Sequence, residues 1–229
     1  MTNSDEDFRD YLQETEFLNY NHPSVIDFFN RYKGDEKNLK NQAVSLYLAV
    51  RDEIRYNPYF DSKNREVLKA SGVINAKEGF CVSKAVLYAA LLRKCGIPGR
   101  LGFADVKNHL STKRFIEMLR TDIFYFHGYT EAYLDHKWVK ATPAFHKRLC
   151  KVFHVEPLEF TGERDSIFQE YSKDGSRYME YLSEYGTFAD LPVELMTKVY
   201  RKHYAHLMDL KNFEKGDMET EALEEYNLR

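Results

Sequence analysis

The chain has 229 residues, 43% of them hydrophobic, and a formal net charge of −3. This length suits one substantial domain, and so small a charge gives no reason to expect a general nucleic-acid surface. No apolar run of about 20 residues occurs, so no membrane-spanning helix is expected. The acidic start over residues 1–7 is unlike a secretory signal. Three cysteines without metal-site spacing favour a reduced, cytoplasmic protein.

Helical periodicity dominates the first third of the chain. Residues 1–20 are predicted to form an acidic helical lead-in, and Ser24 is predicted to cap a short helix after it. Residues 36–56 carry the clearest apolar stripe, and Pro58 ends that helix. A shorter helix is expected over residues 63–71.

A further helix begins at a cysteine. Apolar residues follow Cys81 at helical spacing, and Gly96 and Pro98 end the helix. Unpaired N–H groups and the helix dipole favour a thiolate at an N-terminus, so this placement predicts a reactive Cys81 and an unreactive Cys95. The alternative is that Cys81 is a small buried hydrophobic residue. The predicted apolar stripe consists of Val82, Ala85, Val86, Ala89, Leu92 and Cys95.

Strands are predicted next. Residues 99–104 form the first, and a short amphipathic helix is expected within 105–122. Residues 123–134 form a second strand, because they are rich in aromatic and β-branched types. His136 then belongs to a two-residue hairpin turn before a return strand over 137–141. Alternation along the second strand places four side chains on one face: His127, Tyr129, Glu131 and Tyr133.

The last third of the chain is less regular. Residues 162–190 are expected to mix short helical pieces with core aromatics. Pro192 is expected to open an amphipathic helix in which His203 is a packing residue. The acidic tail from Glu214 is predicted to be loose.

Several linked motifs carry a family resemblance, and their order along the chain makes it specific. The segments are Ile54-Arg55-Tyr56-Asn57-Pro58, Gly79-Phe80-Cys81, Gly96-Ile97-Pro98-Gly99-Arg100, the run from His127 to Leu134, and Trp138-Val139. Together they resemble the transglutaminase-like superfamily over about residues 40–145.

The resemblance implies an α+β, papain-like core. N-terminal helices and the nucleophile helix would pack on an antiparallel sheet, followed by a mostly helical C-terminal extension. We therefore expect a single domain over residues 1–229, with the transglutaminase-like core at about 36–145 and the extension, 146–229, docked on it. The family's Cys-His-Asp triad implies Cys81 as nucleophile and His127 as base.

The third member of that triad departs from the family pattern. Its position, four residues after the tryptophan and just before a proline, holds Thr142. Threonine can accept a hydrogen bond from a ring N–H, but it offers no charge to stabilise an imidazolium. Three interpretations remain: Thr142 is a weaker orienting residue, a carboxylate such as Asp105 replaces it, or the site is chemically silent.

Substrate contacts are predicted from the same resemblance. Tyr129 stands where the family has tryptophan and provides an aromatic wall with a hydroxyl, although packing alone would also explain it. Asn108 and His109 lie in a connection that is near the active-site rim in the family, and an exposed polar loop is the alternative.

The function predicted from these residues is a cysteine-dependent acyl-transfer enzyme. It would act on an amide or peptide bond through a thioester, as a protease or amidase rather than a transamidase, because no calcium-loop pattern occurs. Its substrate would be a peptide, a protein or a small amide, and no cofactor, nucleic acid or membrane is expected. The alternative is a catalytically weak or inactive fold used as a binding module. A metal site formed by Cys81, His109 and His127 is a weaker alternative because their spacing is wide.

Overall fold

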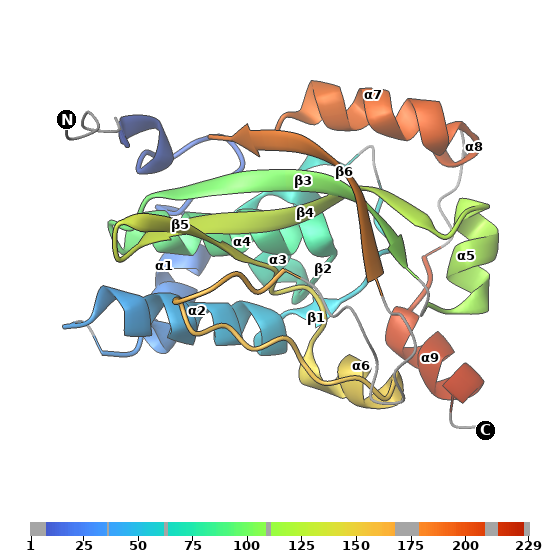
Figure 1. Cartoon of the computed structure of the whole chain (residues 1–229), viewed down its shortest axis with the longest axis horizontal. Helices are drawn as coiled ribbons and strands as arrows, with labels where there is room; N and C mark the ends of the chain where they lie inside the picture. Colours follow the sequence, from blue (N-terminus) through green and yellow to red (C-terminus); the bar gives the residue numbers. More distant parts are fainter. Residues whose placement is uncertain are drawn as a thin grey trace.

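The computed structural model describes residues 8–35, 37–61, 64–108, 111–167, 179–208 and 215–226. The fold is α+β, and a four-stranded antiparallel sheet in the order β5-β4-β3-β6 lies at its centre (Figure 1). The sheet strands are β3 (Gly99–Asn108), β4 (Ile123–Leu134), β5 (Lys137–Ala141) and β6 (Met179–Phe188). The predicted fold class, helices packed on an antiparallel sheet, is confirmed.

Short helices and a small parallel ladder precede the sheet. The ladder pairs β1 (Arg55–Tyr56) with β2 (Glu78–Gly79), which leads directly into the cysteine helix. The helical elements are η1 (Arg9–Tyr11), α1 (Pro23–Tyr32), α2 (Leu39–Glu53), η2 (Arg65–Leu68), α3 (Ala70–Ala76) and α4 (Cys81–Lys94). In the described part of the predicted lead-in only η1 is helical. The cap of α1 is His22 rather than Ser24, because the His22 ring accepts the Ser24 N–H.

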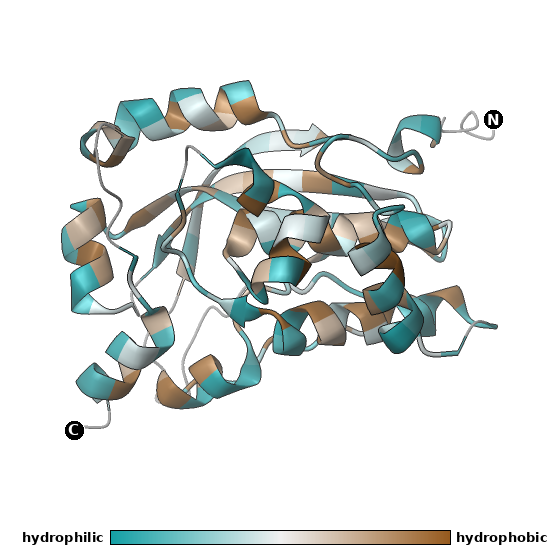
Figure 2. Ribbon diagram, turned by 180° about the vertical axis from the view of Figure 1, so that it is seen from behind, coloured by the Kyte–Doolittle hydropathy of each residue, from teal (hydrophilic) through white to brown (hydrophobic). Residues whose placement is uncertain are grey.

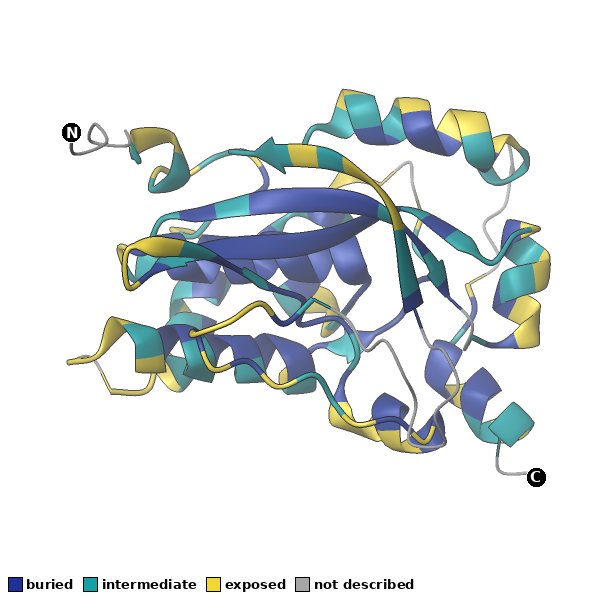
Figure 3. Ribbon diagram, viewed as in Figure 1, coloured by how far each residue is buried: buried dark blue, intermediate teal, exposed yellow. Residues whose placement is uncertain are grey.

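Helix α4 is the central helix of the molecule. Every residue from Cys81 to Arg93 is buried, so the apolar stripe predicted from the sequence understates its burial (Figure 3). The sheet covers one side of α4, where the Thr130 hydroxyl donates to the Ala85 carbonyl at 2.9 Å. Helices α2 and α3 also pack on α4. Buried Lys84 donates to the carbonyls of Arg51 and Ile54, where α2 ends.

The hairpin between β4 and β5 matches the prediction. Asp135 and His136 both have positive φ, 48° and 65°, as a tight type I′ turn requires. His136 therefore lies at an exposed turn, as predicted.

Two predictions for the last third are wrong. Described residues 179–188 form strand β6, not helical pieces, because the strand pairs along β3 over its whole length. Residues 218–226 form helix α9 rather than a loose tail, and buried Met218 and Ala222 attach it to the core. The remaining helices are α5 (Lys113–Leu119), α6 (Lys147–Val152), α7 (Val193–His203), α8 (Ala205–Met208) and α9 (Met218–Tyr226).

Helix α7 has the amphipathic character predicted for it. Hydrophilic and hydrophobic residues alternate along its ribbon in Figure 2. Met196, Val199 and Tyr200 are buried on its inner side, and the His203 ring stacks on Tyr125 with centroids 3.5 Å apart. None of the helices within the described ranges has the length and apolar character needed to cross a membrane.

Candidate functional site

Local contacts fix Cys81 as the first residue of α4. The Phe80 N–H donates to the Ser83 hydroxyl at 3.0 Å, which satisfies one of the unpaired donors at the helix start. A Cβ at position 79 would lie 2.7 Å from that hydroxyl oxygen, so glycine leaves room for the contact. The Gly-x-Cys sequence therefore specifies both the turn into the helix and the position of the thiol.

Strand β4 touches the first turn of α4 at Gly128. A Cβ at position 128 would lie 2.8 Å from the Cα of Val82, closer than packed atoms allow. Glycine lets the strand and the helix backbones approach, and the Gly128 N–H group faces the Cys81 thiol. The residue that follows His127 is thus in contact with the residue that follows Cys81.

Burial controls the ionisation of the thiol. The Cys81 side chain is only 9% exposed, and burial raises its pKa to about 11, although the N–H groups of Gly128, Val82 and Cys81 itself favour the thiolate. The helix-start argument alone predicted a lowered pKa and is corrected here: desolvation outweighs it. Burial likewise raises the pKa values of Cys95 and Cys150, to about 12.

His127 is a buried, neutral imidazole. It is 2% exposed, and burial lowers its pKa to about 4. Within the described residues neither of its ring nitrogens has a hydrogen-bond partner. Strand β4 thus places the predicted base directly before Gly128, whose backbone N–H faces the Cys81 thiol, but among the described residues no hydrogen bond joins the imidazole to the thiol.

Thr142 lies just beyond the end of β5. Its N–H donates to the Ser166 carbonyl at 2.9 Å, and its own carbonyl accepts the Tyr47 hydroxyl at 3.1 Å. The β4–β5 ladder ends at the pair Thr130 and Ala141, one residue before Thr142. The Thr142 hydroxyl oxygen is buried and, among the described residues, has no hydrogen-bond partner.

Asp105 does not replace the missing carboxylate. It accepts the Phe126 N–H at 3.1 Å and the hydroxyls of Ser183 and Tyr185 at 2.9 and 2.8 Å. Phe126 has a φ of 63°, at the register shift where β3 and β4 bulge apart. Asp105 therefore holds the backbone immediately before His127 and makes no hydrogen bond to its ring.

The predicted substrate-binding residues lie elsewhere. Tyr129 is 1% exposed and packs beside Gly102, with the Lys140 ammonium 5.0 Å from its ring centre. Asn108 is buried at the end of β3, where its N–H donates to the Asp122 carbonyl. His109 lies outside the described residues. Neither Tyr129 nor Asn108 contributes to the cavity at Cys81.

An apolar cavity of about 100 Å³ opens onto Cys81. The sequence alone did not predict this cavity, because the residues that line it come from distant parts of the chain. Helix periodicity found the apolar sides of α5 and α7, but it could not say what those sides face. The lining residues are Tyr56, Pro58, Phe60, Phe80, Cys81, Phe115, Met118, Leu119, Phe124, Tyr125, Tyr200, Tyr204, Leu207 and Met208.

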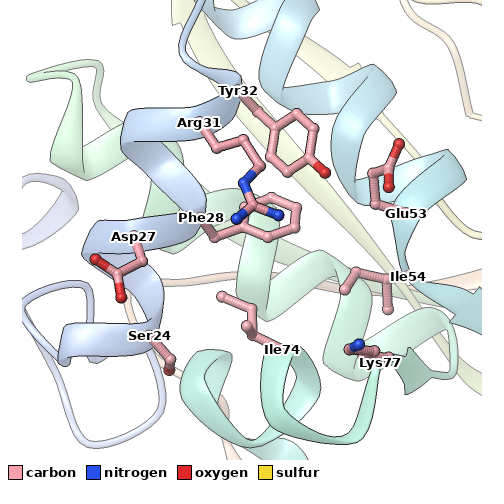
Figure 4. Close-up of a pocket in the computed structure, with 9 residues that line it drawn as sticks. All are labelled: Ser24, Asp27, Phe28, Arg31, Tyr32, Glu53, Ile54, Ile74 and Lys77. Carbon is pink, nitrogen blue, oxygen red and sulfur yellow. The ribbon is translucent and has the colours of Figure 1, made fainter.

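A larger hollow of about 360 Å³ lies between α1, α2 and α3, away from the cysteine (Figure 4). Its lining mixes Asp27 and Glu53 with Arg31 and Lys77, and it includes no nucleophilic thiol. Within the described ranges, no three His, Cys, Asp or Glu side chains gather closely enough to hold a metal ion. Of these two hollows, the cavity at Cys81 is the one lined by a thiol.

Comparisons with known proteins agree with the motifs. Residues 27–143, just over half of the chain, match the model of the family described as the transglutaminase-like superfamily. A crystal structure of a putative cysteine protease from Cytophaga hutchinsonii is similar to 62% of this chain, at 18% identity and a TM-score of 0.46. The similar region spans only 43% of that protein. No curated protein gives a significant match.

The burial of Cys81 predicts a high pH midpoint for its alkylation. With iodoacetamide and peptide mass spectrometry, the folded protein should show a midpoint well above the unperturbed value of about 8.5, towards 11. The same peptide in denaturant, where the thiol is hydrated, is the control and should titrate near 8.5. A folded-state midpoint at or below that of the control would show that the helix-start donors outweigh burial.

The burial of His127 predicts acid sensitivity. The folded protein disfavours the imidazolium, so the unfolded chain takes up the proton first as pH falls below about 6.5. Stability should be complete above that pH and decline towards pH 4, by about 3 kcal/mol. In denaturant titrations, His127→Gln should flatten this decline, whereas His136→Gln, at the exposed turn, should not. Equal slopes in wild type and His127→Gln would contradict the assignment.

Close backbone packing predicts that Gly128 cannot be replaced. Gly128→Ala places a methyl group against the Val82 backbone and should destabilise the protein by roughly 1–3 kcal/mol. Because the strand must move away from α4, the alkylation rate of Cys81 should change as well. Unfolding in urea and alkylation kinetics measure the two effects, and an alanine variant of wild-type stability would show that the contact is soft.

Proposed function

Because the chain belongs to the transglutaminase-like superfamily, we propose that it is a cysteine-dependent acyl-transfer enzyme. It would act on an amide or peptide bond through a thioester on Cys81. The observation that carries the proposal is the position of Cys81: it begins the central helix, faces the N–H of Gly128 next to His127, and lines a cavity. We favour hydrolysis, as in a protease or amidase, over transfer of the acyl group to an amine. From the cysteine usage we also propose that the enzyme is cytoplasmic.

The ionisation states define how the reaction would begin. Near neutral pH the thiol, with a pKa of about 11, and the imidazole, with a pKa of about 4, are both uncharged. A preformed thiolate–imidazolium pair is therefore scarce in the free protein. Proton transfer from Cys81 to His127 would accompany attack of sulfur on the carbonyl, after substrate has brought the two groups together.

The remaining steps conserve the proton. The C–S bond forms as the C–N bond of the amide breaks, and His127 returns the proton to the leaving amine. Water then attacks the thioester, His127 takes its proton, and the acid and the free thiol are released. The N–H groups of Gly128 and Val82, which already face sulfur, would favour negative charge that develops at the site.

Thr142 has a positioning role in this scheme. Its buried hydroxyl and the ring of His127 both lack hydrogen-bond partners among the described residues, and Thr142 directly follows β5, the strand that pairs with β4. A ring N–H donated to the Thr142 oxygen would fix the tautomer without adding charge. We expect a weaker base than a carboxylate-paired histidine would be.

A binding module is the second candidate. The same unpartnered imidazole, the threonine in the third position and the buried thiol are what a chemically silent site would also contain. In that case Cys81 would serve as a small packing residue, and the cavity would hold a ligand without reacting with it.

Replacing the cysteine separates the two candidates. Cys81→Ala should abolish hydrolysis of amides and activated esters, and His127→Ala should reduce it by roughly 10²–10⁴-fold. Cys95→Ala, at the other end of the same helix and half-buried, is the matched control and should retain activity. Full turnover by Cys81→Ala would rule out the thioester. A ligand bound equally well by Cys81→Ala and wild type, without turnover by either, would favour the binding module.

A further inference from the structure

The cavity at Cys81 is apolar on every described side. All of its lining side chains are aromatic, aliphatic or sulfur-containing, and none of them is an acidic or basic residue. Phe60 stacks flat on Phe80 with ring centres 4.0 Å apart, and Phe115 meets Phe124 edge to face at 5.5 Å. These pairs give the cavity stiff aromatic walls.

One polar group of the cavity wall is already hydrogen-bonded to the backbone. The Tyr204 hydroxyl donates to the Ile123 carbonyl at 2.9 Å and accepts the Tyr125 N–H at 2.9 Å. A carboxamide or a carboxylate placed in the cavity would lose its hydration with little in return, which is costly for an amide and more so for a charge. An apolar group has no hydrogen bonds to water to lose, and it would gain contacts with the apolar walls.

The position of sulfur determines which part of a substrate enters. Cys81 forms part of the cavity wall, and it is only 9% exposed, so a carbonyl reaches sulfur from the cavity side. The group attached next to that carbonyl must then occupy the cavity. A volume of about 100 Å³ suits one branched or aromatic side chain and not an extended chain.

We propose that this site selects acyl donors with a single apolar side chain, of phenylalanine or leucine type, beside the reacting carbonyl. The proposal rests on the acyl-transfer function proposed above and names its substrate class. It disfavours glutamine and glutamate side chains in the same cavity, because the lining offers them no charged or amide side chain.

Part of the selectivity comes from outside the matched family region. Beyond residues 27–143, the lining includes Tyr200 of α7, Tyr204 at the junction of α7 and α8, and Leu207 and Met208 of α8. Helix α8 is fixed to α5 by a hydrogen bond between the His206 ring and the Met118 carbonyl at 2.8 Å. The two helices lie beside each other at one end of the sheet (Figure 1). Flexible Met118 and Met208 on these helices can adjust to different apolar groups.

Activated esters test the substrate class directly on the full chain. The probes are N-acetyl p-nitrophenyl esters of phenylalanine, leucine, glutamine and glutamate. In each, the C–S bond to Cys81 forms as p-nitrophenolate leaves, and the thiol proton is released to His127 and then to solvent. The p-nitrophenol burst gives the acylation rate, which is divided by the rate of the same ester with N-acetylcysteine to remove intrinsic reactivity.

Phenylalanine and leucine esters should acylate Cys81 roughly tenfold faster than the glutamine ester and on the order of a hundredfold faster than the glutamate ester. Met118→Arg, which places a cation in the cavity wall, should shift the preference towards glutamate. Leu182→Arg is the control, because Leu182 is 50% exposed on β6 and does not line the cavity, and it should keep the wild-type order. Met208→Arg replaces Met118→Arg if that variant does not fold.

The outcomes separate this inference from the function on which it rests. Acylation of Cys81 at equal normalised rates by all four esters would overturn the substrate class and leave the thioester mechanism standing. An ester preference left unchanged by Met118→Arg, or by Met208→Arg where that variant replaces it, would also overturn the substrate class, since the cavity would not be the acyl site. No mass increase on Cys81 with any of the esters would overturn the proposed function and the inference together.

Discussion

The contact between Gly128 and Val82 is the constraint on which the site depends. It brings the backbone of β4 against the first turn of α4, and so fixes the base-bearing strand relative to the cysteine. Short-range contacts fix the backbone on each side of this contact. Gly79 and Ser83 shape the start of the helix, while the bulge at Phe126, held by Asp105, sets the strand just before His127. A side chain at position 128 would push strand β4 away from the first turn of α4.

Close packing of this kind has an electrostatic consequence. Helix α4 is surrounded by the sheet and by α2 and α3, so its first residue is largely removed from water. The donors at the helix start act on the Cys81 thiol over one or two contacts, whereas desolvation acts on the whole charge. Burial therefore raises the pKa of the thiol and lowers that of His127. Near neutral pH both groups are therefore uncharged, and in the proposed reaction charge would develop only when substrate is present.

The C-terminal part of the chain contributes residues to the candidate site. Strand β6 extends the sheet beyond β3, and α7 and α8 carry aromatic and apolar side chains to the cavity at Cys81. The matched family region, residues 27–143, contains the cysteine and the histidine, whereas α7 and α8, beyond it, supply part of the cavity wall.

The sequence by itself determined the fold class, the start of the cysteine helix, the β4–β5 hairpin and the identity of the two candidate reactive residues. These features rest on local rules of capping, periodicity and turn chemistry, and on linked motifs. Only the tertiary structure decided the ionisation of Cys81, the task of Asp105 and the walls of the cavity. Each of these depends on segments far apart in the chain: Asp105 meets Tyr185 of β6, and Tyr204 of α7–α8 meets β4. Strand β6 itself was missed because its register comes from pairing with β3, and such pairing leaves little trace in local periodicity.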